Sequence, residues 1–527
     1  MIDRQEPSSF HEMIERYNRQ IQEAKRRPPV SEPPSCPNPE PQESSCPPPP
    51  CPPQKPQPLP DRESVASPSR RPAHHSAPSL PEKPCDKVSC DDKTDFSQTA
   101  GIRGPVLLQD SILHETLATF VNHKPLERVL HVKGYGAFGY FQPYQSMSKY
   151  TKACFLQDPA QRTPTFTRFS LMIGSQDTPD SCRNVRGFST KFYTKDGIFD
   201  LLCNQIPVFF LRDAMRFPEA IAALSPSPVN NLPDPSLFWD FIARTPQAMH
   251  MLTWLYSDVG TSCSFQTMGG HGVNTFVWCN AEGKRWYVKY HWIPLAGERY
   301  IDRHEAQQTA GQNPYIAGQS LYHSLARGQV IEYELRVQLM DPADENNVPF
   351  DPLDDTKIWS ETQYPLLPVG LLTLEHNPDD YRSQVEQSAF SPANLIEGIE
   401  LSNDAMLQGR SFIYWDAQRR RLGPGFRDLS INCTPGWSPA RSFVTSGEGM
   451  PVSGVETRAC PRDSDPFTQA GERYRSLDAL NQEHLVDNIA SELYAMPKHI
   501  QKPVLDSIQK CDQAFAQHLV RQMEIYC

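Results

Sequence analysis

The chain has 527 residues, of which 38% are hydrophobic, and its 51 basic and 62 acidic residues give a formal net charge of −11. This length suffices for one large domain or several ordinary ones. The acidity argues against a general nucleic-acid-binding role, because phosphate backbones bind basic surfaces. No run of 18 apolar residues is present, so no membrane-spanning helix is expected. With neither a secretory leader nor a peroxisomal ending, a cytoplasmic location is expected.

The first 100 residues differ in composition from the rest of the chain. They hold 22 of the 52 prolines and no glycine. Such a segment has little apolar surface to bury, so residues 1–100 are predicted to be a disordered, proline-rich arm. A capping-box pattern at residues 9–12, followed by apolar residues at helical spacing, indicates one short helix over 9–25.

From residue 101 the composition becomes globular. Short segments rich in aromatic and β-branched residues predict strands over 129–141, 168–173, 187–193 and 204–211, and a hairpin over 274–292. A helix is expected over 246–256. Residues 345–440 are proline-rich, as in a segment that wraps over a core. Residues 475–494 and 500–525 have helical spacing interrupted by Pro497 and Pro503. The fold class is therefore α+β, with a large antiparallel β core and a helical C-terminal region.

Residues 134–139 match the dinucleotide-binding pattern G-x-G-x-x-G. That pattern requires a helix that begins inside it, so that the helix N-terminus can hold a pyrophosphate. Here the chain continues as Tyr140-Phe141-Gln142-Pro143, which favours a strand. We therefore interpret the glycines as part of a strand that packs closely against a neighbour.

Three segments carry the chemistry, namely 127–134 (ERVLHVKG), 199–210 (FDLLCNQIPVFF) and 407–416 (LQGRSFIYWD). At these segments the sequence resembles the haem-containing monofunctional catalases, as a divergent small-subunit type with a proline-rich N-terminal extension. The resemblance runs from about residue 104 to residue 433. It implies a catalase-like antiparallel β-barrel, with a threading arm and barrel over 101–375, a wrapping segment with the proximal tyrosine over 376–440, and a helical region over 465–527.

The same resemblance implies an enzyme that converts hydrogen peroxide to water and dioxygen, relevant to oxidative stress. It also implies a homotetramer with one haem b per subunit. Tyr414 matches the proximal iron ligand. Arg410 lies four residues earlier, on the same face of a helix, and its permanent positive charge would favour the phenolate that binds ferric iron.

On the opposite, distal side of the haem the resemblance assigns the acid–base role to His131, placed in the strand over 129–141. Ser170 matches the residue that holds this imidazole, and Asn204 matches the amide that orients peroxide. The adjacent residue is Gln205 where the family has a second asparagine, and it is interpreted as a tolerated neighbour.

The remaining cofactor contacts are also matched. Arg128, Arg168 and Arg421 correspond to the arginines that neutralise the two haem propionates, since buried carboxylates require such partners. Phe217 corresponds to an aromatic residue that packs near the haem on its distal side.

The sequence departs from the family at its second cofactor, NADPH, and at the peroxide channel. Matching positions survive at His250, Ser257 and Trp359. Val259 and Ile293 stand at the positions that should hold the 2′-phosphate, and Glu361 stands at the position that should contact the ring. NADPH binding is therefore not expected. Along the peroxide channel, Leu130 and Met172 replace the family's usual valines, and Asn184 replaces its usual aspartate. These three replacements predict slower entry of peroxide.

Two other functions are compatible with parts of the sequence. One is a catalase-fold haem protein that acts on organic peroxides, such as the allene oxide synthases, but these carry Thr before the distal His where this chain has Leu130. The other is a degenerate haem protein that acts through its proline-rich arm. The presence of His131, Asn204, Arg410 and Tyr414 argues against degeneracy.

Overall fold

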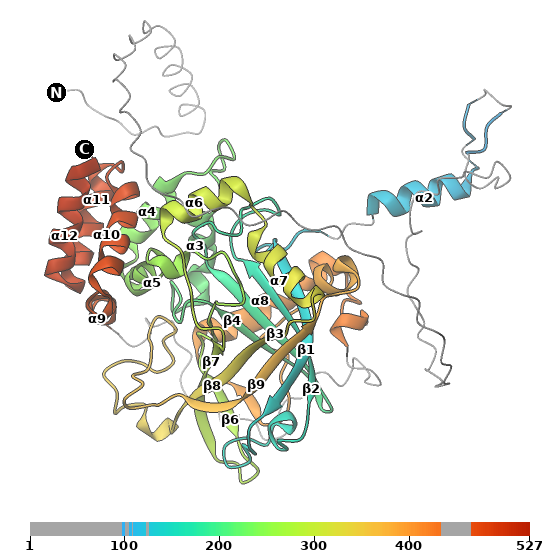
Figure 1. Cartoon of the computed structure of the whole chain (residues 1–527), viewed down its shortest axis with the longest axis horizontal. Helices are drawn as coiled ribbons and strands as arrows, with labels where there is room; N and C mark the ends of the chain where they lie inside the picture. The colour runs from blue at the N-terminus through green and yellow to red at the C-terminus, as the bar shows by residue number, and fades with distance from the viewer. Residues whose placement is uncertain (1–96, 101–104, 108, 123–125, 434–464, 527) are drawn as a thin grey trace, which may run out of the picture. The chain divides into compact units, whose positions relative to one another are not determined.

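The computed structural model describes residues 97–100, 105–107, 109–122, 126–433 and 465–526 (Figure 1). The proline-rich stretch 1–96, with the helix expected over 9–25, lies outside the described residues. The first described helix is α2 (Ser111–Asn122).

An antiparallel sheet of ten strands forms the centre of the fold. The strands run in the order β10-β6-β7-β5-β4-β3-β2-β1-β9-β8, and an additional pairing of β7 with β8 closes eight of them into a barrel. The predicted α+β class and antiparallel barrel are therefore confirmed. The barrel strands are β1 (Gly134–Pro143), β2 (Thr163–Leu171), β3 (Arg186–Thr194), β4 (Gly197–Asn204), β5 (Gly270–His271), β7 (Arg285–Pro294), β8 (Ile331–Met340) and β9 (Leu367–His376). Beside β7 the sheet continues into β6 (Phe276–Cys279) and β10 (Ile399–Leu401).

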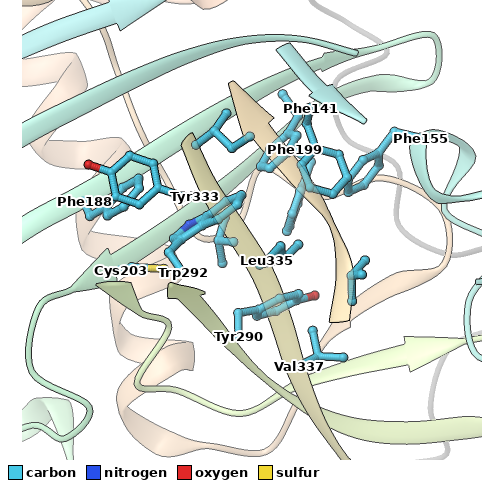
Figure 2. Packing of buried hydrophobic residues seen from close by; sticks show 14 of the residues in the cluster. Phe141, Phe155, Phe188, Phe199, Cys203, Tyr290, Trp292, Tyr333, Leu335 and Val337 are labelled. Carbon is cyan, nitrogen blue, oxygen red and sulfur yellow. The ribbon is translucent and has the colours of Figure 1, made fainter. Parts of the chain in front are cut away.

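Aromatic side chains fill the barrel interior (Figure 2). The rings of Phe188 and Trp292 stack with centroids 5.7 Å apart, and Tyr333 meets Phe188 edge-on at 4.8 Å. Such pairs stabilise a core beyond the area that they bury. Because side chains occupy the interior, a large cofactor has to bind outside the barrel.

Several helices form a second apolar core. There α4 (Pro235–Arg244) and α5 (Met249–Leu255) pack against the C-terminal helices (Figure 1). The remaining helices are α3 (Phe217–Leu224), α6 (Arg303–Gln312), α7 (Ile316–Ala326), α8 (Ala405–Leu422), α9 (Thr468–Ser476), α10 (Ala479–Leu493), α11 (Lys498–Cys511) and α12 (Gln513–Tyr526). Within the described part of the chain, no helix is both long and apolar enough to cross a bilayer.

Several expected elements differ in their bounds. The predicted strand over 204–211 is wrong: β4 ends at Asn204, where the chain leaves the sheet, and Pro207 could not donate to a ladder. The predicted break at Pro503 is also wrong, because this proline lies inside α11. Its neighbours Val504 and Ile508 are buried in the helical core, and this packing outweighs the local cost of proline. The hairpin is confirmed, with Gly283 at its turn in the left-handed region (φ 81°).

A buried ion pair anchors the segment that follows the barrel. Lys191 of β3 and Asp200 of β4 are fully buried, with Nζ 2.8 Å from Oδ1. Lys191 also donates to the Ala389 carbonyl at 2.9 Å, and Asp200 accepts from the Ser391 amide at 3.0 Å. The β3–β4 hairpin therefore holds the segment that leads into α8.

Candidate active site

His131 lies just before β1 and not within a strand, so the strand placement from sequence is wrong. Its φ of 59° is in the left-handed region, which takes it out of the pleat. The His131 amide donates to the Met172 carbonyl at 2.9 Å, and Arg168 Nη1 donates to the His131 carbonyl at 2.9 Å. Strain of this kind persists only where the surroundings impose it, and it is concentrated at functional sites.

A single row of paired residues crosses four neighbouring strands beneath this histidine. Gly134 pairs with Ser170, Ser170 with Gly187, and Gly187 with Asn204. Directly paired residues of antiparallel strands project their side chains to the same face. His131 Nδ1 lies 2.9 Å from Ser170 Oγ, in a hydrogen bond whose donor depends on the tautomer. The structure thus brings His131, Ser170 and Asn204 to one face of the sheet.

Gly187 creates the space for this arrangement. A Cβ atom at this position would lie 2.6 Å from Ser170 Oγ and 2.9 Å from the His131 ring. From the sequence, Gly187 was placed at the start of a predicted strand but was given no role. The close approach is visible only once the register of β2 and β3 is known.

The amide of Asn204 and that of its neighbour have different surroundings. Gln205 is buried, its Oε1 accepts from the Arg186 amide at 2.5 Å, and its Nε2 donates to the Asn184 carbonyl at 2.8 Å. Among the described residues, no hydrogen bond engages the Asn204 side chain. These contacts favour Asn204 over Gln205 as the group available to a substrate.

The surroundings of His131 keep its imidazole neutral. Burial lowers the pKa of His131, and together with the positive charges of Arg168, Arg410 and Arg128 it brings the pKa to about 3. A neutral imidazole can accept a proton at neutral pH, as an acid–base group must. The influence of Arg410 also shows that the two halves of the expected site converge.

The expected proximal residues lie on α8. Asp404 caps this helix by accepting from the Leu407 amide at 2.9 Å, and Gly423 ends it with φ 83°. Arg410 and Tyr414 are one turn apart, and Arg410 Nη2 donates to Tyr414 Oη at 3.0 Å. The pairing expected from the four-residue spacing is therefore present.

Two of the three expected propionate-binding arginines contact Glu386, and the charge of Glu386 acts on the third, Arg168. Arg128 Nη1 forms an ion pair with Glu386 Oε1 at 2.9 Å, and Arg421 Nη1 donates to the Glu386 carbonyl. Both guanidinium groups also donate to the Ser388 carbonyl. Burial and the charge of Arg128 lower the pKa of Arg168 and of Arg421 to about 9 each.

This cluster fits a haem. Three cations against one carboxylate leave a surplus of two positive charges, which matches two propionates. Arg168 Nε is buried and has no hydrogen-bond partner among the described residues. Val129, which follows Arg128 in the chain, exposes 65% of its surface, as an apolar wall for a flat macrocycle would. A buried like-charge cluster is costly unless an anion neutralises it.

Phe217, the other expected cofactor contact, begins α3. Its ring stacks on Phe209 with centroids 6.0 Å apart and an interplanar angle of 24°. This gives a rigid aromatic pair. Its contact with haem stays a prediction.

Comparison with known proteins agrees with this geometry. Residues 87–455 match the family model described as Catalase, and residues 461–523 match one described as Catalase-related immune-responsive. The chain belongs to the catalase family. It is 38% identical over 461 residues to the catalase of Methanosarcina barkeri, which covers 81% of this chain and 91% of that protein. Catalase isozyme 3 of Zea mays is also 38% identical, over 459 residues, with 81% and 92% covered. A solved bacterial catalase matches with a TM-score of 0.77 at 33% identity, covering 85% of this chain and 97% of that one.

Some residues of this catalase-family site were missed by sequence reasoning. Glu386 is 258 positions from Arg128, with which it pairs, and no local pattern indicates the contact. Tyr381 donates to the Gly134 carbonyl at 3.1 Å and lies close to Arg168. Both belong to a π-helical turn (Tyr381–Glu386), and no local pattern in the sequence indicated this turn.

Asn184, at the channel position where an aspartate was expected, has a structural contact. Its Nδ2 donates to the Ile173 carbonyl at 2.8 Å, and its Oδ1 accepts from the Ile173 amide at 3.2 Å. An aspartate could not make the first of these bonds. The change Asn184→Asp would therefore restore the family's carboxylate only with loss of the hydrogen bond to the Ile173 carbonyl.

Two of the positions relevant to NADPH, Ser257 and Val259, line a small cavity of about 180 Å³. Arg473 of α9 also lines this cavity. Arg473 Cζ is 3.8 Å from the centroid of the Trp254 ring. Arg473 thus supplies a cation that the sequence argument had not considered.

Proposed function

We propose that this protein disproportionates hydrogen peroxide into water and dioxygen at a haem b held by Tyr414. The observation that carries the proposal is the combination of a neutral His131 bound to Ser170 with a Tyr414–Arg410 pair and a three-arginine anion site. The membership of the catalase family supports the same reaction.

In this proposal the distal residues bind and orient peroxide. If His131 Nδ1 donates to Ser170 Oγ, Nε2 is left as the proton acceptor. Nε2 would take a proton from one oxygen of the peroxide and return it to the other. The Asn204 amide donates to peroxide and so stabilises the charge that separates during this transfer.

The proximal residues hold the cofactor. Arg128, Arg168 and Arg421 would bind the two propionates, and the Tyr414 oxygen would bind the iron. Arg410 donates to that oxygen and so favours its anionic form. The haem iron, when bound, supplies the redox chemistry by which one peroxide is reduced and a second is oxidised.

The decisive experiment is oxygen evolution from hydrogen peroxide by the purified, haem-loaded protein, with His131→Ala as the control. The variant should keep its haem and lose activity by about 10²- to 10⁴-fold, as expected for a lost acid–base group. Turnover within tenfold of the wild type would contradict the role of His131. The same assay with an organic hydroperoxide separates catalase from organic-peroxide activity.

We infer a homotetramer as part of the same proposal. Phe412 and Ile413 on α8 expose 73% and 53% of their surface, and Met215 lies exposed on the short turn that packs against α8. Such a cluster of exposed apolar residues is typical of a subunit interface. Light scattering that gives the mass of one subunit would contradict the inference.

We further infer that NADPH is not a cofactor. Val259 and Ile293 offer no cation at the positions where the family holds the 2′-phosphate, and Glu361 adds like charge. Micromolar binding of NADPH in calorimetry would overturn this inference. The cytoplasmic location and a role in oxidative stress rest on the sequence alone.

A further inference from the structure

Two histidines that the proposed function does not use face each other on neighbouring strands. His271 of β5 pairs directly with His291 of β7, so both side chains project to the same face of the sheet. His271 Nδ1 lies 2.9 Å from His291 Nδ1, and both residues are half-buried. A hydrogen bond between two ring nitrogens requires that one of them carries a proton and the other does not.

Gln338 of β8 fixes the proton on His291. Gln338 is 3% exposed, and its Nε2 donates to the carbonyls of Trp359 at 3.1 Å and of Tyr364 at 2.7 Å. These two acceptors orient the amide, and its other end, Oε1, lies 3.2 Å from His291 Nε2. Because an amide oxygen only accepts, His291 Nε2 is the donor of this hydrogen bond.

The proton positions on both rings follow from this hydrogen bond. No carboxylate pairs with His291 among the described residues, and a charge kept from water without a partner is costly, so this ring is neutral. Its Nδ1 is then an acceptor, and His271 Nδ1 donates to it. The other nitrogen of His271, Nε2, is left with a free electron pair. Within the described ranges, Nε2 forms no hydrogen bond and no ion pair.

A carboxylate oxygen faces the same space as this nitrogen. Glu298 lies in the segment after β7, and its Oε2 accepts from Tyr300 Oη at 3.0 Å. A Cβ atom at Gly269 would lie 2.6 Å from Glu298 Oε1 and 3.6 Å from His271 Nε2. The charge of Glu298 also acts on Arg473, with which it forms no ion pair in the described part of the chain. The absence of a side chain at Gly269 therefore leaves a space bordered by two acceptor atoms.

Two acceptors that border one space require a donor or a cation between them. Imidazole nitrogen and carboxylate oxygen are both ligands of Zn²⁺, at about 2.0–2.2 Å. A histidine that binds a metal donates its other ring N–H to a fixed partner, and a ligating carboxylate is itself hydrogen-bonded. His291 and Tyr300 supply these two contacts. No third His, Cys, Asp or Glu joins the pair among the residues that the structure describes, so water completes the coordination.

We propose that His271 Nε2 and Glu298 Oε1 bind a divalent transition-metal ion of the Zn²⁺ class. The ion links β5 to the segment after β7, while His291 and Gln338 hold the His271 ring in the tautomer that leaves Nε2 free. Mg²⁺ fits this site poorly, because it prefers oxygen ligands. The site goes beyond the proposed function, since neither ligand takes part in the reaction with peroxide.

The test is a calorimetric titration of Zn²⁺ into the full-length, haem-loaded protein after treatment with a chelator. His271→Gln removes the nitrogen ligand, Glu298→Gln removes the charge of the carboxylate, and Tyr300→Phe removes only the hydroxyl that donates to Glu298. His304→Gln is the matched control, because His304 is an exposed histidine on α6. Circular dichroism checks folding, and each titration is repeated with excess Mg²⁺.

The wild type should bind one equivalent of Zn²⁺ more than His271→Gln and Glu298→Gln, and excess Mg²⁺ should not displace this equivalent. Tyr300→Phe should keep it but bind it about 10- to 100-fold more weakly, as expected when a ligating carboxylate loses its hydrogen bond. His304→Gln should have the stoichiometry and affinity of the wild type. Cysteines that bind Zn²⁺ elsewhere contribute equally to all five proteins, so the difference isolates this site.

Equal stoichiometry and affinity in the wild type, His271→Gln and Glu298→Gln would overturn the inference. Displacement of the extra equivalent by excess Mg²⁺ would also overturn it, because the ion would then be held by charge and not by the imidazole nitrogen. If His271→Gln does not fold, Glu298→Gln decides alone, because Glu298 is exposed. Zn²⁺ binding by this variant equal to that of the wild type then overturns the inference.

Discussion

Replacement of Gly187 by alanine tests the geometry of the distal residues without removal of any of their functional groups. The added Cβ would lie 2.6 Å from Ser170 Oγ and 2.9 Å from the His131 ring, whereas real Cβ atoms essentially never approach closer than 3.0 Å. The imidazole or the hydroxyl therefore has to move by several tenths of an ångström. Displacements on the order of 1 Å at a catalytic group cost roughly 10²-fold in rate. For this smaller displacement we expect a loss of oxygen evolution of about tenfold, up to roughly 10²-fold.

The assay is steady-state oxygen release at matched haem content, with thermal unfolding measured in parallel. Overpacking should cost about 1–3 kcal/mol of stability, so the protein is expected to fold and bind haem. Gly311→Ala in α6 is the matched control, because a Cβ there meets nothing within 4 Å. A Gly187→Ala protein with turnover within threefold of the wild type would refute the argument that this glycine makes room for His131.

Three further predictions concern the cofactor, the pH dependence and the channel. Tyr414→Phe should lose most bound haem, measured as Soret absorbance per protein, and full occupancy with an unchanged spectrum would refute the ligation. His250 is neutral in the folded state because burial lowers its pKa to about 3. Below pH 6.5 the unfolded state therefore binds one more proton than the folded state, so the free energy of unfolding decreases as the pH is lowered. Between pH 6.5 and 5 this histidine should account for a loss of about 2 kcal/mol in the free energy of unfolding, so the His250→Gln protein should lose that much less. Urea titrations at both pH values measure this, and an equal loss in the variant and the wild type would contradict the assignment. Met172→Val should raise turnover at high peroxide in stopped-flow oxygen measurements, with Met251→Val as a buried control, and no increase would argue against a hindered channel.

Local sequence patterns predicted those parts of the site that depend on near neighbours. The four-residue spacing of Arg410 and Tyr414 was sufficient, since one helical turn brings such residues together. The hairpin turn at Gly283 was likewise predictable from its residues. By contrast, the row from Gly134 to Asn204 depends on the register of four strands, which no short segment encodes.

Other features depend on contacts across the whole chain. The positive φ of His131 follows from hydrogen bonds to Met172 and Arg168, so the sequence alone favoured an ordinary strand. The partnership of Arg128 with Glu386 spans 258 residues. Family resemblance supplied the roles of the arginines, but their contacts with Glu386 and the surplus of charge required the folded structure.

The buried pair of Lys191 and Asp200 has a consequence for the order in which the enzyme matures. The pair lies within one hairpin, whose contacts are local and form early, while the segment that it anchors arrives about 190 residues later in the chain. Only after that segment docks can α8 bring Tyr414 to the barrel. Uptake of haem by a refolding chain should therefore lag behind the burial of the barrel tryptophans, seen by fluorescence, and simultaneous signals would contradict this sequence of events. Bound haem would then mark those chains that have completed their assembly.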